Sequence, residues 1–153
     1  MPKQSAGILL YRYKSNQLQV FLVHPGGPFF KNKDDGVWSI PKGEFLENEE
    51  ALVAAKREFL EETGQAINDG EFIELSPVQL KSGKIVHAWA IEGDIDHEVI
   101  LSNNFEMEWP PKSGKMGSFP EVDRAAWFDP ETAKVKINPA QAKLIEELET
   151  VLL

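Results

Sequence analysis

The stretch GEFLENEEALVAAKREFLEETG, from Gly43 to Gly64, decides how this chain folds. It predicts a loop that leads into a helix, and the second half of that helix carries Glu58, Glu61 and Glu62. On a helix these residues are spaced i, i+3 and i+4, so their carboxylates share one face of about 100°. The opposite arc carries apolar side chains that are expected to pack on a core, namely Leu52, Ala55 and Phe59.

Capping residues mark the ends of this predicted helix. Asn48 is expected at the N-cap, with Glu49 and Glu50 complementing the helix dipole in the first turn. Gly64 fits a left-handed C-cap. The three carboxylates therefore lie in the C-terminal half, where the dipole disfavours them and like charges at i, i+4 cost a few tenths of a kcal/mol. Such a break of a local rule favours a functional site that holds a cation.

The same stretch resembles the Nudix box, G-x5-E-x7-R-E-U-x-E-E-x-G-U. The fixed positions match at Gly43, Glu49 and residues 57–64. Phe59 fits the first apolar position, whereas Gln65 stands where an aliphatic residue is expected, and Ile67 is the candidate to take over that packing. The departure concerns packing after the helix rather than the charged positions. The competing interpretation, an acidic and solvated helix face, does not explain this many identities at fixed spacing.

The chemistry expected of this cluster is that of a hard divalent cation. Carboxylates without histidine or cysteine suit Mg²⁺ or Mn²⁺, which bridge to substrate phosphates. The resemblance implies that the ligands are Glu58, Glu61 and Glu62, with the backbone carbonyl of Lys42 or Gly43 as a further donor. It also implies that Arg57 orients these carboxylates, and that Glu49 either pairs with Arg57 or reaches the metal through water. The implied reaction is attack of water on a phosphorus within a diphosphate linkage.

A further carboxylate is expected from outside the box. Glu121 precedes Trp127 at a spacing similar to the pre-strand glutamate of the dinucleoside-polyphosphate hydrolase branch, which makes it a candidate ligand or base. The alternative for Glu121 is a solvated loop residue, and Glu106 and Glu108 are weaker candidates. The general base is left open among Glu61, Glu62 and Glu121.

Four further residues are candidates for binding the substrate. Lys42 resembles the lysine in the Pro-Lys-Gly of the same branch and is expected to hold a phosphate, as are Arg12 and Lys84 with weaker support. Trp89 is a candidate for stacking on a base, against the commoner role of a strand tryptophan in the core. The three histidines show no metal-ligand spacing and are interpreted as structural, namely His24, His87 and His97.

Composition narrows the class of protein. A chain of 153 residues fits one domain, residues 1–153, and the absence of cysteine excludes a disulfide framework or a thiolate site. No apolar run of 18 residues and no signal-peptide pattern is present, so a cytoplasmic location and no membrane partner are expected. The net charge of −9 argues against a nucleic-acid polymer as partner. It still permits a phosphorylated small molecule, because a bound cation reverses the local field.

The order of elements predicts the fold class. Strands are expected at residues 5–13, 18–23, 71–80, 85–91 and 121–128. A short helix or turn is expected from Pro130, and a last helix has Pro139 near its N1 position. This order predicts an α+β or α/β sandwich with helices on both faces of a mixed sheet, and the resemblance implies the same α/β/α architecture.

Two loops are expected to matter. In the loop at residues 24–36, Phe29 and Phe30 either tuck under the chain or line a base-binding pocket. Residues 94–115 are expected to be a long loop of the kind that often forms a functional lid. At the start of the box, Gly43 is expected to supply a backbone conformation that other residues resist.

The resulting hypothesis is a metal-dependent Nudix pyrophosphohydrolase acting on a nucleoside diphosphate derivative, as monomer or homodimer. The run WSIPKG at residues 38–43 leans toward dinucleoside polyphosphates such as Ap4A. One alternative is a house-cleaning hydrolase of (oxidised) NTPs or dNTPs. Another, from a different class, is a non-catalytic Nudix-fold nucleotide sensor, although such modules usually lose box carboxylates that this chain keeps.

Overall fold

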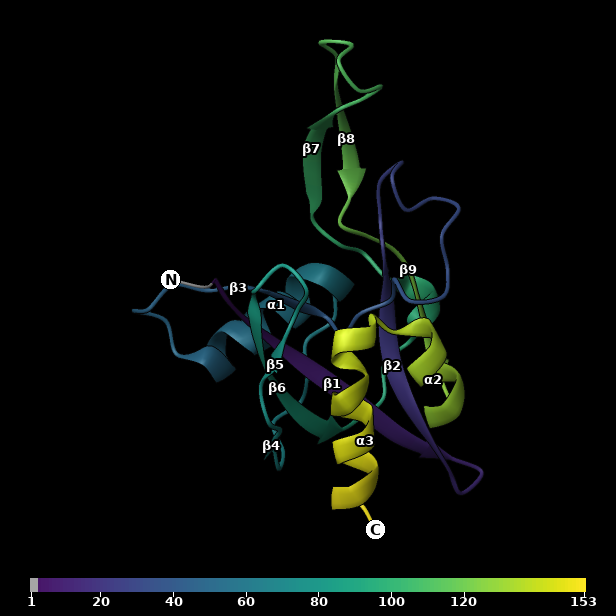
Figure 1. Cartoon of the computed structure of the whole chain (residues 1–153). Coiled ribbons are helices and arrows are strands. Elements are labelled where there is room, and N and C mark those ends of the chain that lie inside the picture. Colours follow the sequence, from purple (N-terminus) through teal and green to yellow (C-terminus); the bar gives the residue numbers. More distant parts are fainter. Residues whose placement is uncertain (1–2) are drawn as a thin grey trace.

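In the computed structural model, which describes residues 3–153, a seven-stranded mixed sheet forms the centre of the molecule (Figure 1). Its main path is β4-β6-β1-β2-β9, with β3 paired to β1 and β5 paired to β6. Only β1 and β6 run parallel among the described pairs. The strands span Gln4–Lys14 (β1), Gln17–Pro25 (β2), Lys42–Glu44 (β3), Ile73–Glu74 (β4), Val78–Gln79 (β5), Ile85–Glu92 (β6) and Val122–Phe128 (β9).

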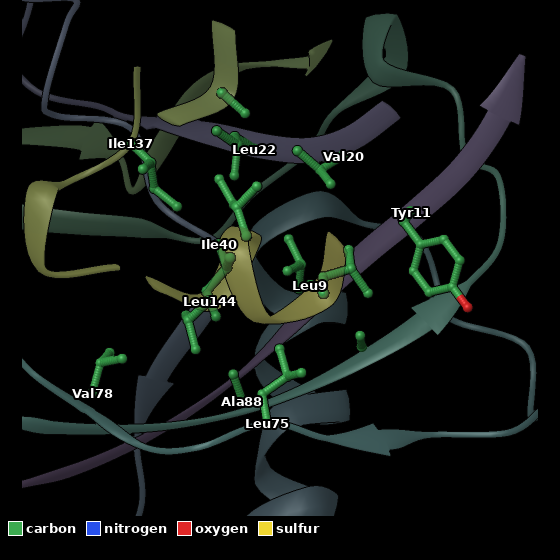
Figure 2. Close-up of a cluster of buried hydrophobic side chains, with 14 of the residues drawn as sticks. Leu9, Tyr11, Val20, Leu22, Ile40, Leu75, Val78, Ala88, Ile137 and Leu144 are labelled. Atoms are coloured by element: carbon green, nitrogen blue, oxygen red, sulfur yellow. The ribbon is translucent and has the colours of Figure 1, made fainter. Parts of the chain in front are cut away.

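The two faces of the sheet carry separate cores, which confirms the expected α/β/α sandwich. Leu9 and Leu22 face α2 (Pro130–Lys136) and α3 (Ala142–Val151), and Figure 2 shows them in one buried cluster with Leu144 of α3. Ile8 of β1 faces the other way, into the cluster that packs under α1 (Ala51–Thr63) and includes Phe59. This period of two along β1 is what places apolar side chains on both faces.

The β1–β2 hairpin explains the register of the central strands. Ser15 and Asn16 both have positive φ, 53° and 65°, as a two-residue turn that matches the strand twist requires. The turn pairs Lys14 with Gln17 and, further along, Tyr11 with Val20. Nearer the start of β1, a separate antiparallel pairing joins Ala6 to Gly43 of β3 and brings the start of the box onto the sheet.

Several predicted boundaries were wrong. Helix α1 begins at Ala51 with Glu50 at the N-cap and no side-chain cap, so Asn48 does not cap it. The strand expected over 71–80 is broken into β4 and β5 around Pro77, which has no N–H to donate. Pro139 opens a short 3₁₀ helix, Pro139–Gln141, that precedes α3. The left-handed C-cap at Gly64 is confirmed, with φ of 76°.

The expected loop over 94–115 is also wrong. After a short 3₁₀ helix at His97–Val99, the chain forms a hairpin of β7 (Asn104–Glu108) and β8 (Met116–Pro120) that is separate from the main sheet. Figure 1 shows this hairpin rising away from the body, beside the loop that follows β2. No helix within residues 3–153 is long and apolar enough to cross a membrane.

Candidate active site

Gly43 and Glu58 form the closest packing in the site. A Cβ atom built on Gly43 would overlap the carboxylate carbon and both carboxylate oxygens of Glu58. Gly43 does not have the positive φ that would require glycine, so the expectation of an unusual backbone conformation is corrected. The glycine is needed because the Glu58 carboxylate occupies the space of a side chain, which holds that carboxylate against strand β3.

Arg57 ties three carboxylates of the site together. Its Nε and Nη2 donate to the two oxygens of Glu49, each at 3.0 Å, in a bidentate pair. Its Nη1 donates to Glu58 Oε1 at 2.9 Å and to Glu61 Oε2 at 3.2 Å. These bonds raise the pKa of Arg57 and lower the pKa of Glu49. Arg57 is therefore placed to fix the orientation of Glu58 and Glu61.

The carboxylates of the site interact unfavourably with one another. Burial raises the pKa of Glu62 to about 8, against the opposing charge of Lys42. Burial, followed by the charge of Glu61, raises the pKa of both Glu58 and Glu121. The negative charge of the four glutamates of the site, Glu58, Glu61, Glu62 and Glu121, therefore exceeds the positive charge of the basic side chains beside them. A divalent cation would supply the missing charge.

A small cavity joins the box to residues outside it. It has a volume of about 150 Å³ and is lined by Lys42, Glu62 and Glu121, together with Val23, Pro25, Ser39 and Val122. The backbone N–H of Lys42 donates to Glu62 Oε1 at 3.3 Å. Burial lowers the pKa of the Lys42 amine, with a smaller contribution from the nearby charge of Lys84. The cavity therefore presents one amine and two carboxylates.

A chain of backbone hydrogen bonds brings Glu121 to this cavity. Asn103 N donates to the carbonyl of Glu61 at the end of α1, and Glu121 N donates to the carbonyl of Asn103, both at 2.9 Å. Gly26 N in turn donates to the carbonyl of Glu121, also at 2.9 Å. The two ends of the β7–β8 hairpin are thereby held between α1 and the loop after β2. Sequence reasoning missed Asn103 and Gly26, because their role lies in the backbone.

The donor set fits a hard cation, although its present rotamers do not enclose one. Within residues 3–153, no three His, Cys, Asp or Glu side chains converge as a ready-made metal cage. The reason is visible in the contacts, because Arg57 draws Glu58 and Glu61 onto its guanidinium. The available ligands are carboxylate oxygens, the type preferred by Mg²⁺ and Mn²⁺.

Of the two other basic residues predicted to bind the substrate, Lys84 lies beside the site and Arg12 lies away from it. Lys84 donates to Glu44 at 3.1 Å and affects the pKa of Lys42, so it lies beside the box. Arg12 instead pairs with Asp94 at 2.8 Å and lies over the Trp127 ring at 4.0 Å. It is six residues along β1 from the residue paired with Gly43, about 20 Å at the rise of a strand. The structure therefore does not bring Arg12 to the carboxylates.

The predicted aromatic and histidine residues have structural surroundings. Trp89 is half-buried and packs in the core under α1, which favours its core interpretation over base stacking. Phe29 and Phe30 pack edge to face on each other, 5.0 Å between ring centroids, but Phe29 is 59% exposed and so is not tucked under the chain as one expectation had it. His24 is fully buried, with Nδ1 bonded to Asp123 at 2.8 Å and Nε2 to the Lys33 carbonyl at 2.7 Å. His24 thus fastens the loop after β2 to strand β9.

Comparison with known proteins gives the same family as the box. The NUDIX domain family matches residues 1–148, which is nearly the whole chain. No curated protein matches. Similar solved structures include an Ap4A hydrolase of C. elegans in a binary complex, with 20% identity, a TM-score of 0.64, and coverage of 98% of this chain and 97% of that one.

Two more similar structures show how widely this fold is used. The NUDIX domain of NrtR from Shewanella oneidensis, complexed with ADP ribose, has 16% identity, a TM-score of 0.67, and coverage of 100% and 90%. A mutT/nudix family protein of Listeria innocua has 18% identity, a TM-score of 0.65, and coverage of 99% and 95%. At these identities the similar structures establish the fold alone, whereas the family match and the box establish the family. The chain therefore belongs to the Nudix family and carries that family's pyrophosphohydrolase box from Gly43 to Gly64.

Proposed function

We propose that this Nudix pyrophosphohydrolase uses Mg²⁺ or Mn²⁺ to hydrolyse a diphosphate linkage in a nucleoside diphosphate derivative, with a preference for dinucleoside polyphosphates such as Ap4A. The observation that carries the proposal is the cavity in which Glu62 and Glu121 meet Lys42, next to the Glu58 carboxylate packed on Gly43. Acidic groups for a cation and an amine for a phosphate are thereby adjacent.

The cation would be held by Glu58, Glu61 and Glu62, with the carbonyl of Gly43 as a further donor. When bound, such an ion polarises a phosphoryl oxygen and makes a water molecule more acidic. Arg57 is a positioning residue in this proposal, because it contacts carboxylates of the site and lies among them rather than in the cavity.

The residues that line the cavity have proposed roles in the reaction. Lys42 would donate a hydrogen bond to a phosphate oxygen, with Lys84 as a second amine nearby. Glu62 and Glu121 face the cavity, whereas Glu61 is engaged by Arg57, so either of the first two would accept the proton of the attacking water. After the P–O bond breaks, the two phosphate products carry negative charge that repels the carboxylates and favours release.

The preference for dinucleoside polyphosphates is supported by the WSIPKG run and by the whole-chain fold similarity to the C. elegans Ap4A hydrolase. The alternative from a different class is a non-catalytic nucleotide sensor, and the NrtR domain complexed with ADP ribose shows that a similar fold binds a nucleotide-type ligand. A cytoplasmic location and a monomeric or homodimeric state remain predictions from the sequence.

The test is a panel of Ap4A, NTPs, oxidised dNTPs and ADP-ribose with Mg²⁺ or Mn²⁺, analysed by chromatography in ¹⁸O-labelled water. We expect Ap4A to give two nucleotides, with ¹⁸O in only one of them. Faster conversion of an NTP or dNTP to a monophosphate and pyrophosphate would replace the preference by the house-cleaning alternative. Binding of a panel member without turnover under either metal would favour the sensor alternative and overturn the proposal.

A further inference from the structure

A second cavity lies between the β7–β8 hairpin and the loop that follows β2, on the side of the molecule where Figure 1 shows both rising from the sheet. Its volume is about 410 Å³, within the roughly 300–1,000 Å³ of small-molecule sites. Trp109, Phe119 and Pro28 contribute apolar walls, and Lys31 and Asp123 contribute polar groups. We refer to it as the aromatic cavity.

The walls of the aromatic cavity are fixed relative to each other. A Cβ atom on Gly26 would overlap the carbonyl oxygen of Pro120, and one on Gly27 would lie 2.8 Å from Cζ of Phe105. The Gly26 N–H also donates to the carbonyl of Glu121 at 2.9 Å. The two glycines therefore let the loop lie directly against the base of the hairpin.

The aromatic cavity adjoins the catalytic cavity along two segments of chain. On the hairpin side, Pro120 lines the aromatic cavity and Glu121, the next residue, lines the catalytic one. On the loop side, Pro25 lines the catalytic cavity and Gly27 the aromatic one. A ligand whose phosphates lie at Lys42 would therefore have the aromatic cavity next to it along the chain.

The chemistry of this space matches a nucleobase. Trp109 and Phe119 are flat apolar surfaces of the kind on which bases stack, and a two-ring purine offers them more stacking surface than a one-ring pyrimidine. The Lys31 amine is a donor, and the Asp123 carboxylate, one oxygen of which is bonded to His24, is an acceptor. Together they complement the acceptors and amino donors that the edge of a base presents. A phosphate group alone would gain nothing from the two aromatic rings.

We propose that the aromatic cavity binds a purine base of the substrate, so that the β7–β8 hairpin determines specificity for the nucleoside while the box acts on the phosphates. This inference rests on the proposed function in one respect, that the substrate is a nucleotide. It assigns the base to Trp109 and Phe119 rather than to Trp89 or Phe29.

The experiment is calorimetric titration with AMP, CMP and ribose 5-phosphate in the presence of Mg²⁺. We expect AMP to bind at least about 10-fold more tightly than ribose 5-phosphate, and more tightly than CMP. Trp109→Ala and Phe119→Ala should each weaken AMP binding about 10-fold, and leave ribose 5-phosphate binding within about twofold. Met116→Ala is the matched control, because Met116 lies on the same hairpin, is 65% exposed, and is outside the cavity lining.

The inference is overturned if AMP affinity in both aromatic variants stays within about twofold of the parent, or if ribose 5-phosphate binds as tightly as AMP. Circular dichroism melting checks that each variant is folded, and Trp109→Phe, which keeps a ring, should retain most of the AMP affinity. Because AMP binding needs no turnover, a chain that hydrolyses nothing would refute the proposed function and leave this test valid. Hydrolysis at the same rate whatever the base would refute this inference and leave the proposed function standing.

Discussion

Helices α1 and α2 lie on opposite faces of the same sheet and differ in how their ends are capped and charged. Helix α2 has Asp129 as an N-cap that accepts from Thr132, proline and Glu131 in its first turn, and Lys134 and Lys136 in its last turn. Helix α1 has no side-chain cap, no acidic residue in its first turn and no basic residue in its last turn. Every local device that stabilises a helix end is present in one and missing from the other, apart from the glycine C-cap of α1.

The charged residues of α2 stabilise the fold, whereas those of α1 are arranged at the expense of stability and form the candidate active site. In α2 the lysines pair with acidic residues, as Lys134 does with Glu131 of the same helix and with Glu149 of α3. In α1 the glutamates face one another and the protein interior, and burial raises the pKa of Glu62 to about 8. In this helix, Glu58 and Glu61 share the single guanidinium of Arg57, which also pairs with Glu49. A bound cation would neutralise the negative charge that remains.

The largest expected effect is on activity. Glu62→Gln or Glu61→Gln should lower kcat more than about 100-fold, because each removes a carboxylate from the site while keeping its shape. The matched control is Glu146→Gln, an exposed glutamate of α3, which should leave kcat within about twofold. Steady-state kinetics on the best substrate of the panel and thermal melting give both readouts. Unchanged turnover in Glu61→Gln and Glu62→Gln alike would refute the placement of the site in α1.

The second prediction concerns the glycine that begins the box. Gly43→Ala would force Glu58 or strand β3 to move, so we expect activity to fall about 10-fold or more and stability to fall by about 1–3 kcal/mol. Gly70→Ala is the control, since the nearest atom to its Cβ would be the flexible Ile91 Cδ1 at 3.3 Å. Chemical denaturation and kinetics measure the two effects. A Gly43→Ala enzyme as active as the Gly70→Ala enzyme would show that this close packing is not needed.

The third prediction is a pH dependence of folding stability that originates from Glu62 of α1. Glu62 has a pKa of about 8 in the folded chain against an ordinary 4.5, so the folded state binds the extra proton between these values. The stability of the metal-free protein should therefore fall as the pH rises from about 4.5 to 8. Mg²⁺ competes with that proton, so its stabilising effect should be larger at pH 9 than at pH 6.

Thermal melting with EDTA or with Mg²⁺ at both pH values measures the stabilisation by the metal. That stabilisation is about 2.7 kcal/mol when the metal is at 100 times its Kd. The variant Glu62→Gln should flatten the dependence. An equal Mg²⁺ shift at pH 6 and pH 9 in the parent protein would mean that the ion binds elsewhere.

The smallest expected effects compare the helix starts. Asp129→Ala removes a cap from α2 and should cost about 1 kcal/mol of stability without changing kcat. Asn48→Ala should change stability by less than about 0.5 kcal/mol, because α1 begins at Ala51 without a side-chain cap. Denaturant titration of both variants decides the point. A loss for Asn48→Ala as large as that for Asp129→Ala would restore the cap that the sequence predicted.

Much of the site was predictable because its geometry is local. The face shared by Glu58, Glu61 and Glu62 follows from helical spacing, and the C-cap at Gly64 follows from the same pattern. The contacts of Arg57 with Glu58 and Glu61 are also within one turn of that helix. The start of α1 was not predictable in the same way, since several polar residues before Ala51 could have capped it.

The sequence by itself therefore determined the two-faced sheet and the acidic helix, because each depends on a period of 2 or 3.6 residues. It also determined the family, because the box is a set of residue identities at fixed spacing. Only the tertiary structure decided that Glu121 reaches Glu62, that Gly43 is needed for space, and that a hairpin builds a second cavity beside the first. These features depend on strand register and on backbone hydrogen bonds such as that from Glu121 to Asn103. Backbone groups are the same in every residue, so the order of side chains does not reveal which of them will pair.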